Sequence, residues 1–165
     1  MAMVSNKGEI KIESGTIGKV IDLDVKDVNY IGAVMAPGAA YVINKHLKDL
    51  NRSIDYYDMV YTGDLGLYGM EILKDLMKED YNIELKNYND CGVMIYDLKK
   101  QPVYSGASGP ACLPLVSYSY IFNLMKQKKL KKVLLVATGS LHSTTMLNQK
   151  LSIPSIAHAI SLEVL

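Results

Sequence analysis

The chain has 165 residues, of which 49% are hydrophobic and 21% charged, a composition typical of a packed globular protein and not of a disordered one. Its 18 Lys and Arg side chains against 17 Asp and Glu leave a net charge of +1, which excludes a polycation built to bind nucleic acid. Two cysteines are too few for a disulfide scaffold, so we expect a reducing compartment and a cytoplasmic protein.

The first half of the sequence predicts strands and helices in alternation. Residues 11–17 alternate moderately between apolar and polar side chains and predict a strand. Apolar residues at helical spacing predict a helix over residues 31–50, whose regular part should begin at Pro37 because proline is best tolerated in a first turn. A short strand over residues 57–62 then precedes an amphipathic helix over residues 69–80.

The second half of the sequence adds one more helix and the last strands. A short apolar run over residues 93–96 is a candidate strand, and a helix is predicted over residues 113–127. Two further strands are predicted over residues 132–137 and 156–164. The order β-α-β-α-β-α-β-β predicts a single α/β domain over residues 1–165, with a sheet that is mostly parallel and ends in an antiparallel hairpin.

The stretch from Val103 to Met125 carries no Asp, Glu, Lys, Arg or His. A membrane-spanning helix needs about 20 predominantly apolar residues. Glycines and prolines interrupt the first half of the stretch, so that only Leu113–Met125 can form a continuous helix, which is too short to span a bilayer. A helix that is apolar nearly all round must be buried on both sides, whereas one sheet covers a single side. We therefore expect a further layer, supplied by a second copy or by another chain.

Charge is distributed unevenly along the chain. Residues 1–90 carry ten basic and fifteen acidic side chains, whereas residues 91–165 carry eight basic and two acidic ones. Five of the eight are Lys126, Lys128, Lys129, Lys131 and Lys132. A solvated helix end, favoured by the helix dipole, explains this run most simply, and contact with an anionic membrane is the alternative. No aromatic residue interleaves the lysines, which disfavours single-stranded nucleic acid as a partner.

Two polar loops form the candidate ligand site. Gly63, Asp64 and Gly66 lie in a turn between a strand and a helix, where backbone N–H groups can face an anion. A tight turn that needs positive φ explains these glycines equally well. The second loop directly follows the strand over residues 132–137, and ligands of open α/β sheets bind beyond the carboxyl ends of strands. Because we expect both preceding strands to be parallel, the loops should share one sheet edge, and the candidates in the second loop are Thr138, Gly139, Ser140 and His142.

Nucleophilic catalysis has weaker support in the sequence. Ser108 lies in a Gly-Ala-Ser-Gly-Pro loop that resembles a nucleophile elbow but has proline where the last glycine is required. Cys112 lies near a helix start, and His142 or His158 is available in principle as its base. A small buried hydrophobic residue is the simpler interpretation of Cys112, and the same holds for Cys91.

Neither a metal site nor a cofactor is expected. His46, His142 and His158 are far apart in the sequence and show no paired spacing. The run over residues 22–27 resembles a calcium loop only superficially, because it lacks the glycine at the sixth position and an acidic residue at the twelfth.

Six motifs occur in a fixed order along the chain: Lys19-Val20-Ile21-Asp22, Met35-Ala36-Pro37, Thr62-Gly63-Asp64-Leu65-Gly66, Asp90-Cys91-Gly92-Val93-Met94-Ile95-Tyr96-Asp97, Ala137-Thr138-Gly139-Ser140-Leu141 and Ile153-Pro154-Ser155-Ile156-Ala157-His158-Ala159. In these motifs the chain resembles the C-terminal half of the stage V sporulation protein AD family, which are thiolase-like proteins of endospore formers. The resemblance covers nearly the whole chain, and the third and fourth motifs are its most specific part.

This resemblance implies a thiolase-like half, a layered α/β fold with a five-stranded mixed sheet. The uncharged helix would then be the central one, between two halves. The resemblance also implies a part in loading dipicolinic acid, with calcium, into the developing spore. Membrane proteins of the same sporulation operon would be partners, at a cytoplasmic site or one peripheral to the forespore inner membrane. Dipicolinate is a small aromatic dicarboxylate, which hydroxyl and backbone N–H donors would suit.

The sequence departs from true thiolases where they carry their catalytic groups. Tyr104 stands near the point where they have a histidine, Thr138-Gly139 replaces their second cysteine, and Gly63-Asp64 replaces an Asn-Glu-Ala-Phe motif. We therefore expect no enzyme activity. The alternatives are an acyl-thioester-handling enzyme that uses Cys112 or Cys91 and a structural subunit without a ligand.

The apolar helix over residues 113–127 also predicts an oligomer. The chain is about half the length that the resemblance implies for two thiolase-like halves, so a second copy is expected to supply the missing half. We predict a two-fold homodimer with this helix at the axis, and pairing with a separate N-terminal half is the alternative. No nucleic acid partner is expected.

Overall fold

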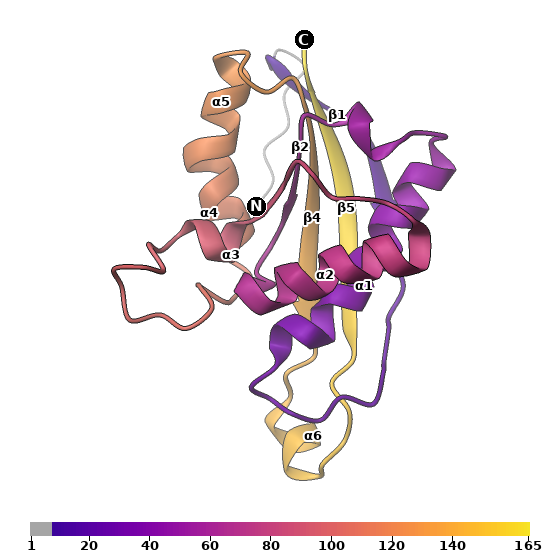
Figure 1. The fold of residues 1–165 in the computed structure, drawn as a ribbon, viewed down its shortest axis with the longest axis vertical. Coiled ribbons are helices and arrows are strands. Elements are labelled where there is room, and N and C mark those ends of the chain that lie inside the picture. Colours follow the sequence, from indigo (N-terminus) through magenta and orange to yellow (C-terminus); the bar gives the residue numbers. More distant parts are fainter. Residues whose placement is uncertain (1–7) are drawn as a thin grey trace.

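The computed structural model describes residues 8–165 and contains one five-stranded sheet (Figure 1). Its strands are β1 (Ile10–Ile17), β2 (Met59–Thr62), β3 (Tyr88–Asp90), β4 (Lys132–Ser140) and β5 (Ser155–Val164), in the order β1-β5-β4-β2-β3. β2 runs parallel to β3 and β4, whereas β5 is antiparallel to β4 and β1. The mixed sheet and its antiparallel last hairpin are confirmed. The sheet is not mostly parallel, however, because β1 pairs with β5 in the antiparallel direction.

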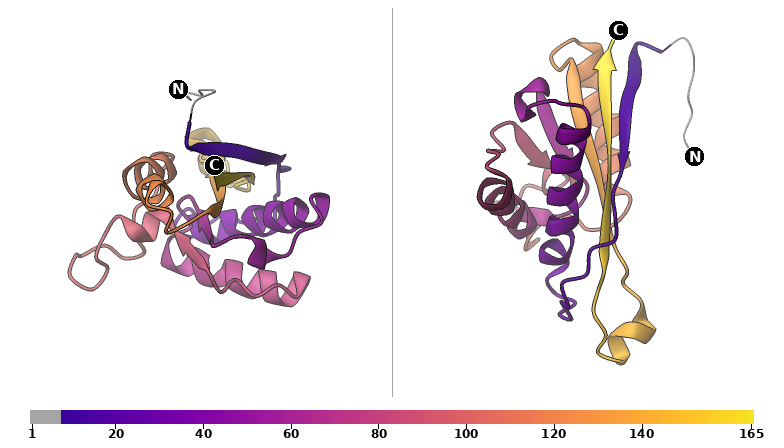
Figure 2. Two further views of the ribbon diagram at one scale, coloured as in Figure 1. Left: turned by 90° about the horizontal axis from the view of Figure 1, so that it is seen from above. Right: turned by 90° about the vertical axis from the view of Figure 1, so that its right-hand side faces the viewer.

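Helices cover both faces of the sheet (Figures 1 and 2). On one face lie α1 (Ile31–Asp49) and α2 (Gly66–Tyr81). On the other face lies one continuous helical segment made of α4 (Cys112–Val116), η2 (Ser117–Ile121) and α5 (Phe122–Lys126). The molecule is therefore a three-layer α/β/α arrangement.

Side chains of the central strands alternate between two cores, as the pleat of a strand requires. Val60, Leu134 and Val136 point into the core beneath α1 and α2. Tyr61 and Leu135 point into the core beneath the segment α4–η2–α5. Burial on both faces explains why β4 reads as a continuous apolar run in the sequence.

Helix α1 begins at Ile31 and not at Pro37, which lies inside the helix. Proline at this position removes the hydrogen bond to the carbonyl of Ala33. The N-terminal turns are held by packing against α2, where Gly32 is so close that a Cβ atom on it would lie 2.3 Å from the carbonyl oxygen of Leu65. Tertiary packing here outweighs the local preference for a start at proline.

The third strand is Tyr88–Asp90, and the prediction of a strand over residues 93–96 is wrong. The carboxylate of Asp90 accepts hydrogen bonds from the N–H groups of Gly92 and Val93, at 3.0 and 3.3 Å. This capping ends the strand and starts the short helix α3 (Cys91–Met94), which takes up the first part of the apolar run.

The helix predicted over residues 113–127 is a helical segment over residues 112–126, but its middle part, η2, is a π-helix. The Ser119 hydroxyl donates to the carbonyl of Leu115 at 2.6 Å, and the Asn123 amide donates to the carbonyl of Ser119 at 2.7 Å. Side-chain bonds of this kind compete with the regular backbone ladder of the helix. Within residues 8–165, no helix is both long enough and apolar enough to cross a membrane.

The same segment is buried on one face only. Val116, Ile121 and Met125 are buried against the sheet, whereas Leu115 and Tyr118 are 55% and 64% exposed. This agrees with the expectation that one sheet covers only one side of the helix. Residues 8–165 supply no layer beyond it, and the chain that would cover the exposed face stays a prediction.

The last two strands are longer than predicted and form a hairpin that projects from the body (Figure 2). β4 continues to Ser140, which pairs with Ser155 of β5. The connection contains α6 (Thr144–Asn148), a helix that the Ser/Thr-rich sequence did not predict. The backbone N–H of Ile153 donates to the carbonyl of Val25 at 2.8 Å, which ties the hairpin to the connection after β1.

A buried polar network joins β1, α1 and the short helix η1 (Ile54–Tyr56). His46 is fully buried, with Nδ1 2.7 Å from the hydroxyl of Thr16 and Nε2 2.7 Å from the hydroxyl of Tyr57. Arg52 donates to the same Tyr57 hydroxyl at 3.2 Å and forms a bidentate ion pair with Glu13 at 2.7 and 3.0 Å. Burial, assisted by the charge of Arg52, lowers the pKa of His46.

We expect the protein to lose stability as the pH falls from about 7.5 to 5.5, the window around the ordinary histidine pKa of about 6.5. Because the pKa of His46 is lower in the folded state, the unfolded chain takes up a proton first, and the free energy of unfolding decreases. Urea unfolding at the two pH values measures the change. His46→Gln should flatten this pH dependence, whereas the same substitution at the exposed His142 should preserve it. An unaltered pH dependence in His46→Gln would contradict the assignment.

Candidate functional site

The two predicted loops meet at one edge of the sheet, as the parallel pairing of β2 and β4 requires. The hydroxyl of Thr138 donates to the carboxylate of Asp64 at 2.8 Å, and the backbone N–H of Asp64 donates to the same hydroxyl at 3.2 Å. Gly63 permits this approach, because a Cβ atom there would lie 2.7 Å from Oγ1 of Thr138. The predicted proximity of Asp64 and Thr138 is confirmed.

A third segment, the loop that leads into α4, also reaches Asp64. The backbone N–H of Gly109 donates to its carboxylate at 2.7 Å, and the hydroxyl of Ser108 lies 3.4 Å from the same oxygen. Asp64 is only 9% exposed. Segments that are far apart in the sequence therefore converge on one carboxylate at the carboxyl edge of the sheet.

Asp90 organises the turn that carries Asp64. Its buried carboxylate accepts hydrogen bonds from the hydroxyl of Thr62 at 2.6 Å and from the N–H groups of Leu65 and Gly66 at 2.9 and 3.1 Å, in addition to the two N–H groups of α3. Burial raises the pKa of Asp90, and the hydrogen bond from Thr62 and those from the backbone oppose this rise. Every partner is a donor, which suits a carboxylate.

The N–H groups at the start of α2 are therefore already used. Those of Leu65 and Gly66 bind Asp90, and that of Leu67 donates to the carbonyl of Ser105 at 2.8 Å. Gly66 has a φ of +69°, so the tight-turn interpretation of the glycines is confirmed. The hypothesis that these N–H groups bind an anionic ligand is wrong, because the carboxylate of Asp90 and the carbonyl of Ser105 already accept their hydrogen bonds.

A small polar pocket of about 150 Å³ opens beside this turn. Asp64 and Gly66 line it together with Leu65 and with Gly106, Ala107 and Ser108 of the loop that was considered only for a nucleophile. Four further lining residues were not singled out in the sequence: Asn29, Ile31, Gly32 and Ser105. Asn29 and Ser105 belong to connections that carry no periodic pattern, which explains why the sequence alone did not reveal them. Asp90 was also missed, although an acidic residue between Tyr88 and Cys91 is a signal for a buried carboxylate.

The other residues of the second loop lie elsewhere. Gly139 and Ser140 are part of β4 and line a separate, largely apolar groove of about 380 Å³. His142 is exposed beyond the end of the strand. The expected loop is largely strand because β4 keeps pairing with β5 as far as Ser140, so only Thr138 reaches Asp64.

The candidate nucleophiles are poorly placed for catalysis. Cys91 and Cys112 are both buried free thiols. Burial raises the pKa of Cys91 to about 12 and also raises the pKa of Cys112. The hydroxyl of Ser108 faces the Asp64 carboxylate instead of a histidine. Within residues 8–165, no group of three His, Cys, Asp or Glu side chains is arranged to hold a metal ion.

These observations define a class of α/β protein with a mixed five-stranded sheet, helices on both faces and a polar pocket at the carboxyl edge of β2. A family model for stage V sporulation protein AD matches residues 1–163, and the chain belongs to this family. The chain is 48% identical over 157 residues to stage V sporulation protein AD of Bacillus subtilis (strain 168). This alignment covers 94% of the chain and 46% of the relative, so the chain spans about half the length of the curated relative it matches.

Among solved structures, the fold is similar to 3-oxoacyl-[acyl-carrier-protein] synthase III from Aquifex aeolicus VF5. The match covers 96% of this chain and 46% of that chain, with 13% sequence identity and a TM-score of 0.48. The element order and the mixed sheet of this chain agree with the thiolase-like half that the sequence resemblance implies.

We expect Asp90→Asn to destabilise the protein by about 2–4 kcal/mol, because the amide nitrogen would face buried N–H groups that lose their acceptor. Urea unfolding measures this loss. Asp75→Asn on the exposed surface of α2 is the matched control and should change the free energy of unfolding by less than about 0.5 kcal/mol. A loss below about 1 kcal/mol in Asp90→Asn would show that the turn does not depend on this carboxylate.

Proposed function

We propose that this chain takes part in binding dipicolinic acid, as its calcium complex, during uptake into the developing spore, and that it catalyses no reaction. Membership of the sporulation protein AD family supports the setting. The observation that carries the proposal is the convergence of Thr138 and Ser108 on Asp64, which lines a polar pocket, with no activated nucleophile beside it.

The charge of Asp64 decides the form of the ligand. A dicarboxylate alone would be repelled by this buried carboxylate, and the N–H groups of the neighbouring turn are already bound to Asp90 and Ser105. Calcium prefers carboxylate and carbonyl oxygens, so the cation of the complex would face Asp64 and offset the repulsion. The ligand in this proposal is therefore calcium dipicolinate rather than free dipicolinate.

The size of the pocket supports a second layer that would complete it. Ligand pockets in proteins are typically about 300 Å³ or larger, whereas this one has about 150 Å³. The ligand would thus be shared between the rim formed by Asn29 and Ser105 and a surface packed beside it. A second thiolase-like half would supply that surface.

The burial and protonation of the two cysteine thiols support the proposal that the chain catalyses no reaction. An acyl-thioester enzyme needs a thiolate, and burial raises the pKa of both Cys91 and Cys112. None of the hydrogen bonds made by residues 8–165 joins a histidine to either cysteine. Alkylation of the thiols should therefore leave ligand binding intact, and incubation with acyl thioesters should give no turnover.

Calorimetric titration tests the ligand. We expect dipicolinate to bind the wild-type protein more tightly with equimolar calcium than without it, and Asp64→Asn to weaken the calcium-dependent part by roughly tenfold or more. Thr138→Val, which removes the hydroxyl that positions Asp64, should weaken it less, and Thr145→Val on the exposed α6 is the matched control. Equal affinity for the ligand in Asp64→Asn and wild type would refute the site.

The missing layer is proposed to be a second copy of this chain. The exposed face of the segment α4–η2–α5 carries Leu115 and Tyr118, beside an apolar groove of about 520 Å³ that Met94 and Ile95 also line. The sheet continues this apolar surface. Ile12 and Ile17 of β1 are 57% and 81% exposed, and they lie on the same sheet face as the helical segment.

Within residues 8–165, the helical segment covers only part of this sheet face, and no second helix lies beside it over β1 (Figure 2). The corresponding helix of a second copy would fill that space and bury the exposed tyrosines of both copies. Exposed apolar surfaces of this extent mark interaction sites, and a stable interface would bury roughly 1,600 Å² or more.

We expect the wild-type chain to be a dimer at micromolar concentration in light scattering. Leu115→Lys should yield a folded monomer, because the side chain is exposed in one copy but would carry an unpaired charge into the interface. Leu151→Lys, on the projecting hairpin, should remain dimeric. A well-folded wild-type monomer, or a Leu115→Lys dimer, would rule out this interface.

We propose that the protein is cytoplasmic or peripheral to the forespore inner membrane. Membrane proteins of the same sporulation operon would be its partners there. The family supports this setting. Peripheral attachment then needs a surface that the membrane attracts.

A further inference from the structure

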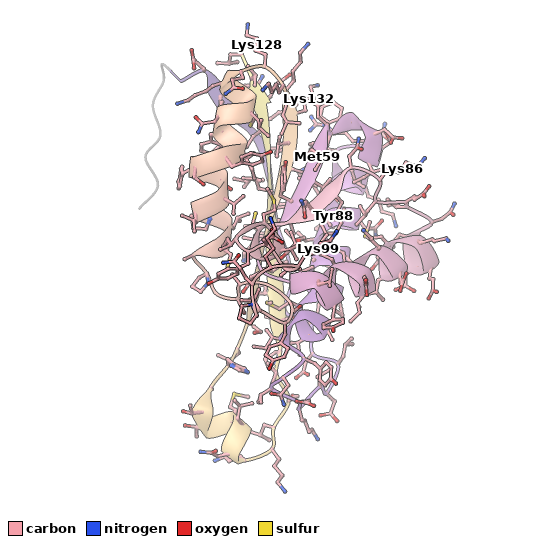
Figure 3. All side chains as sticks on the ribbon, turned by 60° about the vertical axis from the view of Figure 1, so that its left-hand side comes forward. Met59, Lys86, Tyr88, Lys99, Lys128 and Lys132 are labelled. Carbon is pink, nitrogen blue, oxygen red and sulfur yellow. The ribbon has the colours of Figure 1, made fainter. Side chains whose placement is uncertain are left out.

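Five lysines gather at the end of the molecule opposite the pocket. They lie at the end of α5, in the connection that follows and at the first residue of β4: Lys126, Lys128, Lys129, Lys131 and Lys132. Lys128 and Lys132 lie at this end in Figure 3. Thr138 is six residues further along β4, which corresponds to roughly 20 Å of strand. The lysines and the pocket therefore lie on opposite edges of the sheet.

The lysines are held on an ordered turn. Lys128 adopts a left-handed conformation with a φ of +57°, and its N–H donates to the carbonyl of Met125 at 2.8 Å. The N–H of Lys129 donates to the carbonyl of Leu124 at 3.0 Å. These bonds close the helix end, so that the backbone presents the lysines together and needs no ordering of its own when they bind.

Nearby acids do not neutralise the turn. The carboxylate of Asp58 accepts the backbone N–H groups of Lys131 and Lys132, so it fixes the backbone instead of pairing with an ammonium group. Glu163 pairs with Lys132 at 3.6 Å and with Lys11 at 2.8 Å. Among residues 8–165, the other four lysines of the turn form no ion pair, and all four are exposed.

We infer that this lysine turn is a docking surface for an anionic lipid bilayer. Anionic lipids are mobile in the plane of the bilayer and can gather beneath a small cluster of positive charges. Each lysine close to such a surface raises the binding constant roughly fivefold. Nucleic acid fits less well. The ring of Tyr56, which lies beside the turn, is already stacked by Lys132 and Arg52 at 3.8 and 4.0 Å, and the net charge of the chain is only +1.

If the lysine turn faces the bilayer, both the pocket and the proposed dimer surface stay accessible. The pocket at the carboxyl edge faces away from the bilayer. The exposed residues Leu115 and Tyr118 belong to α4 and η2, and the segment α4–η2–α5 runs from the lysine turn toward the other end of the sheet (Figure 1). The inference rests on the peripheral localisation proposed above and does not depend on the identity of the ligand.

Vesicle co-sedimentation tests this surface. We expect wild-type protein to bind vesicles of phosphatidylcholine with about 30% phosphatidylglycerol and to dissociate from them at high salt. It should not bind vesicles of phosphatidylcholine alone. A quadruple Lys→Gln variant at positions 126, 128, 129 and 131 should bind the anionic vesicles at least about a hundredfold more weakly. The matched control makes the same charge change at four exposed lysines elsewhere: Lys48, Lys74, Lys78 and Lys99. The control should bind like wild type.

Each contrary outcome has a distinct meaning. Undiminished binding by the quadruple variant would overturn the lysine turn as the docking surface while leaving peripheral localisation intact. Equal losses in the two quadruple variants would also overturn it, since binding would then follow net charge alone. If the wild-type protein binds no anionic vesicle, this inference is overturned, and so is any direct attachment of the protein to lipid. Tighter binding to a 20-base-pair DNA duplex than to vesicles would identify nucleic acid as the partner and overturn the inference.

Discussion

The arrangement of the candidate site depends on one buried carboxylate, that of Asp90. It terminates β3, caps α3 and accepts the N–H groups of Leu65 and Gly66 that open α2. The buried N–H groups of Leu65 and Gly66 would otherwise lack an acceptor, and each such group costs about 1–3 kcal/mol. Asp64 occupies its place at the pocket because this set of bonds holds the turn between β2 and α2 in one conformation.

Sequence periodicity predicted elements well where burial is regular along one face or along a whole strand. Helix α2 and the strand β4 carry such patterns, and their centres were predicted correctly. The failures occur where a contact distant in the sequence decides the structure. α1 extends before Pro37 because Gly32 packs against α2. The strand β3 ends at Asp90 because the hydroxyl of Thr62 and the N–H groups of Leu65 and Gly66, all far away in the sequence, hold its carboxylate there. Local pattern contains neither contact.

The site was predictable to the extent that the topology was. Parallel strands bring their carboxyl ends to one edge, and this rule alone placed Asp64 beside Thr138. The prediction failed for Ser140 and His142 because the first polar residues after the apolar run were assumed to lie beyond the end of β4. Pairing with β5 continues there, and a strand with a partner tolerates polar side chains on its open face. Asp90 escaped prediction because a carboxylate is ordinarily a surface residue.

The pocket and the apolar helix face are connected through one short loop. The N–H of Gly109 holds the carboxylate of Asp64, and the carbonyl of Gly109 accepts the N–H of Cys112, the first residue of α4, at 3.1 Å. Leu115, on the exposed face, is one helical turn further along. A partner packed on that face would fix the position of α4 and thereby of Gly109. If the proposed second copy packs there, it would act through Gly109 on Asp64, the residue proposed to face the ligand. This gives a physical reason for the proposed site and the proposed interface to share one helical segment.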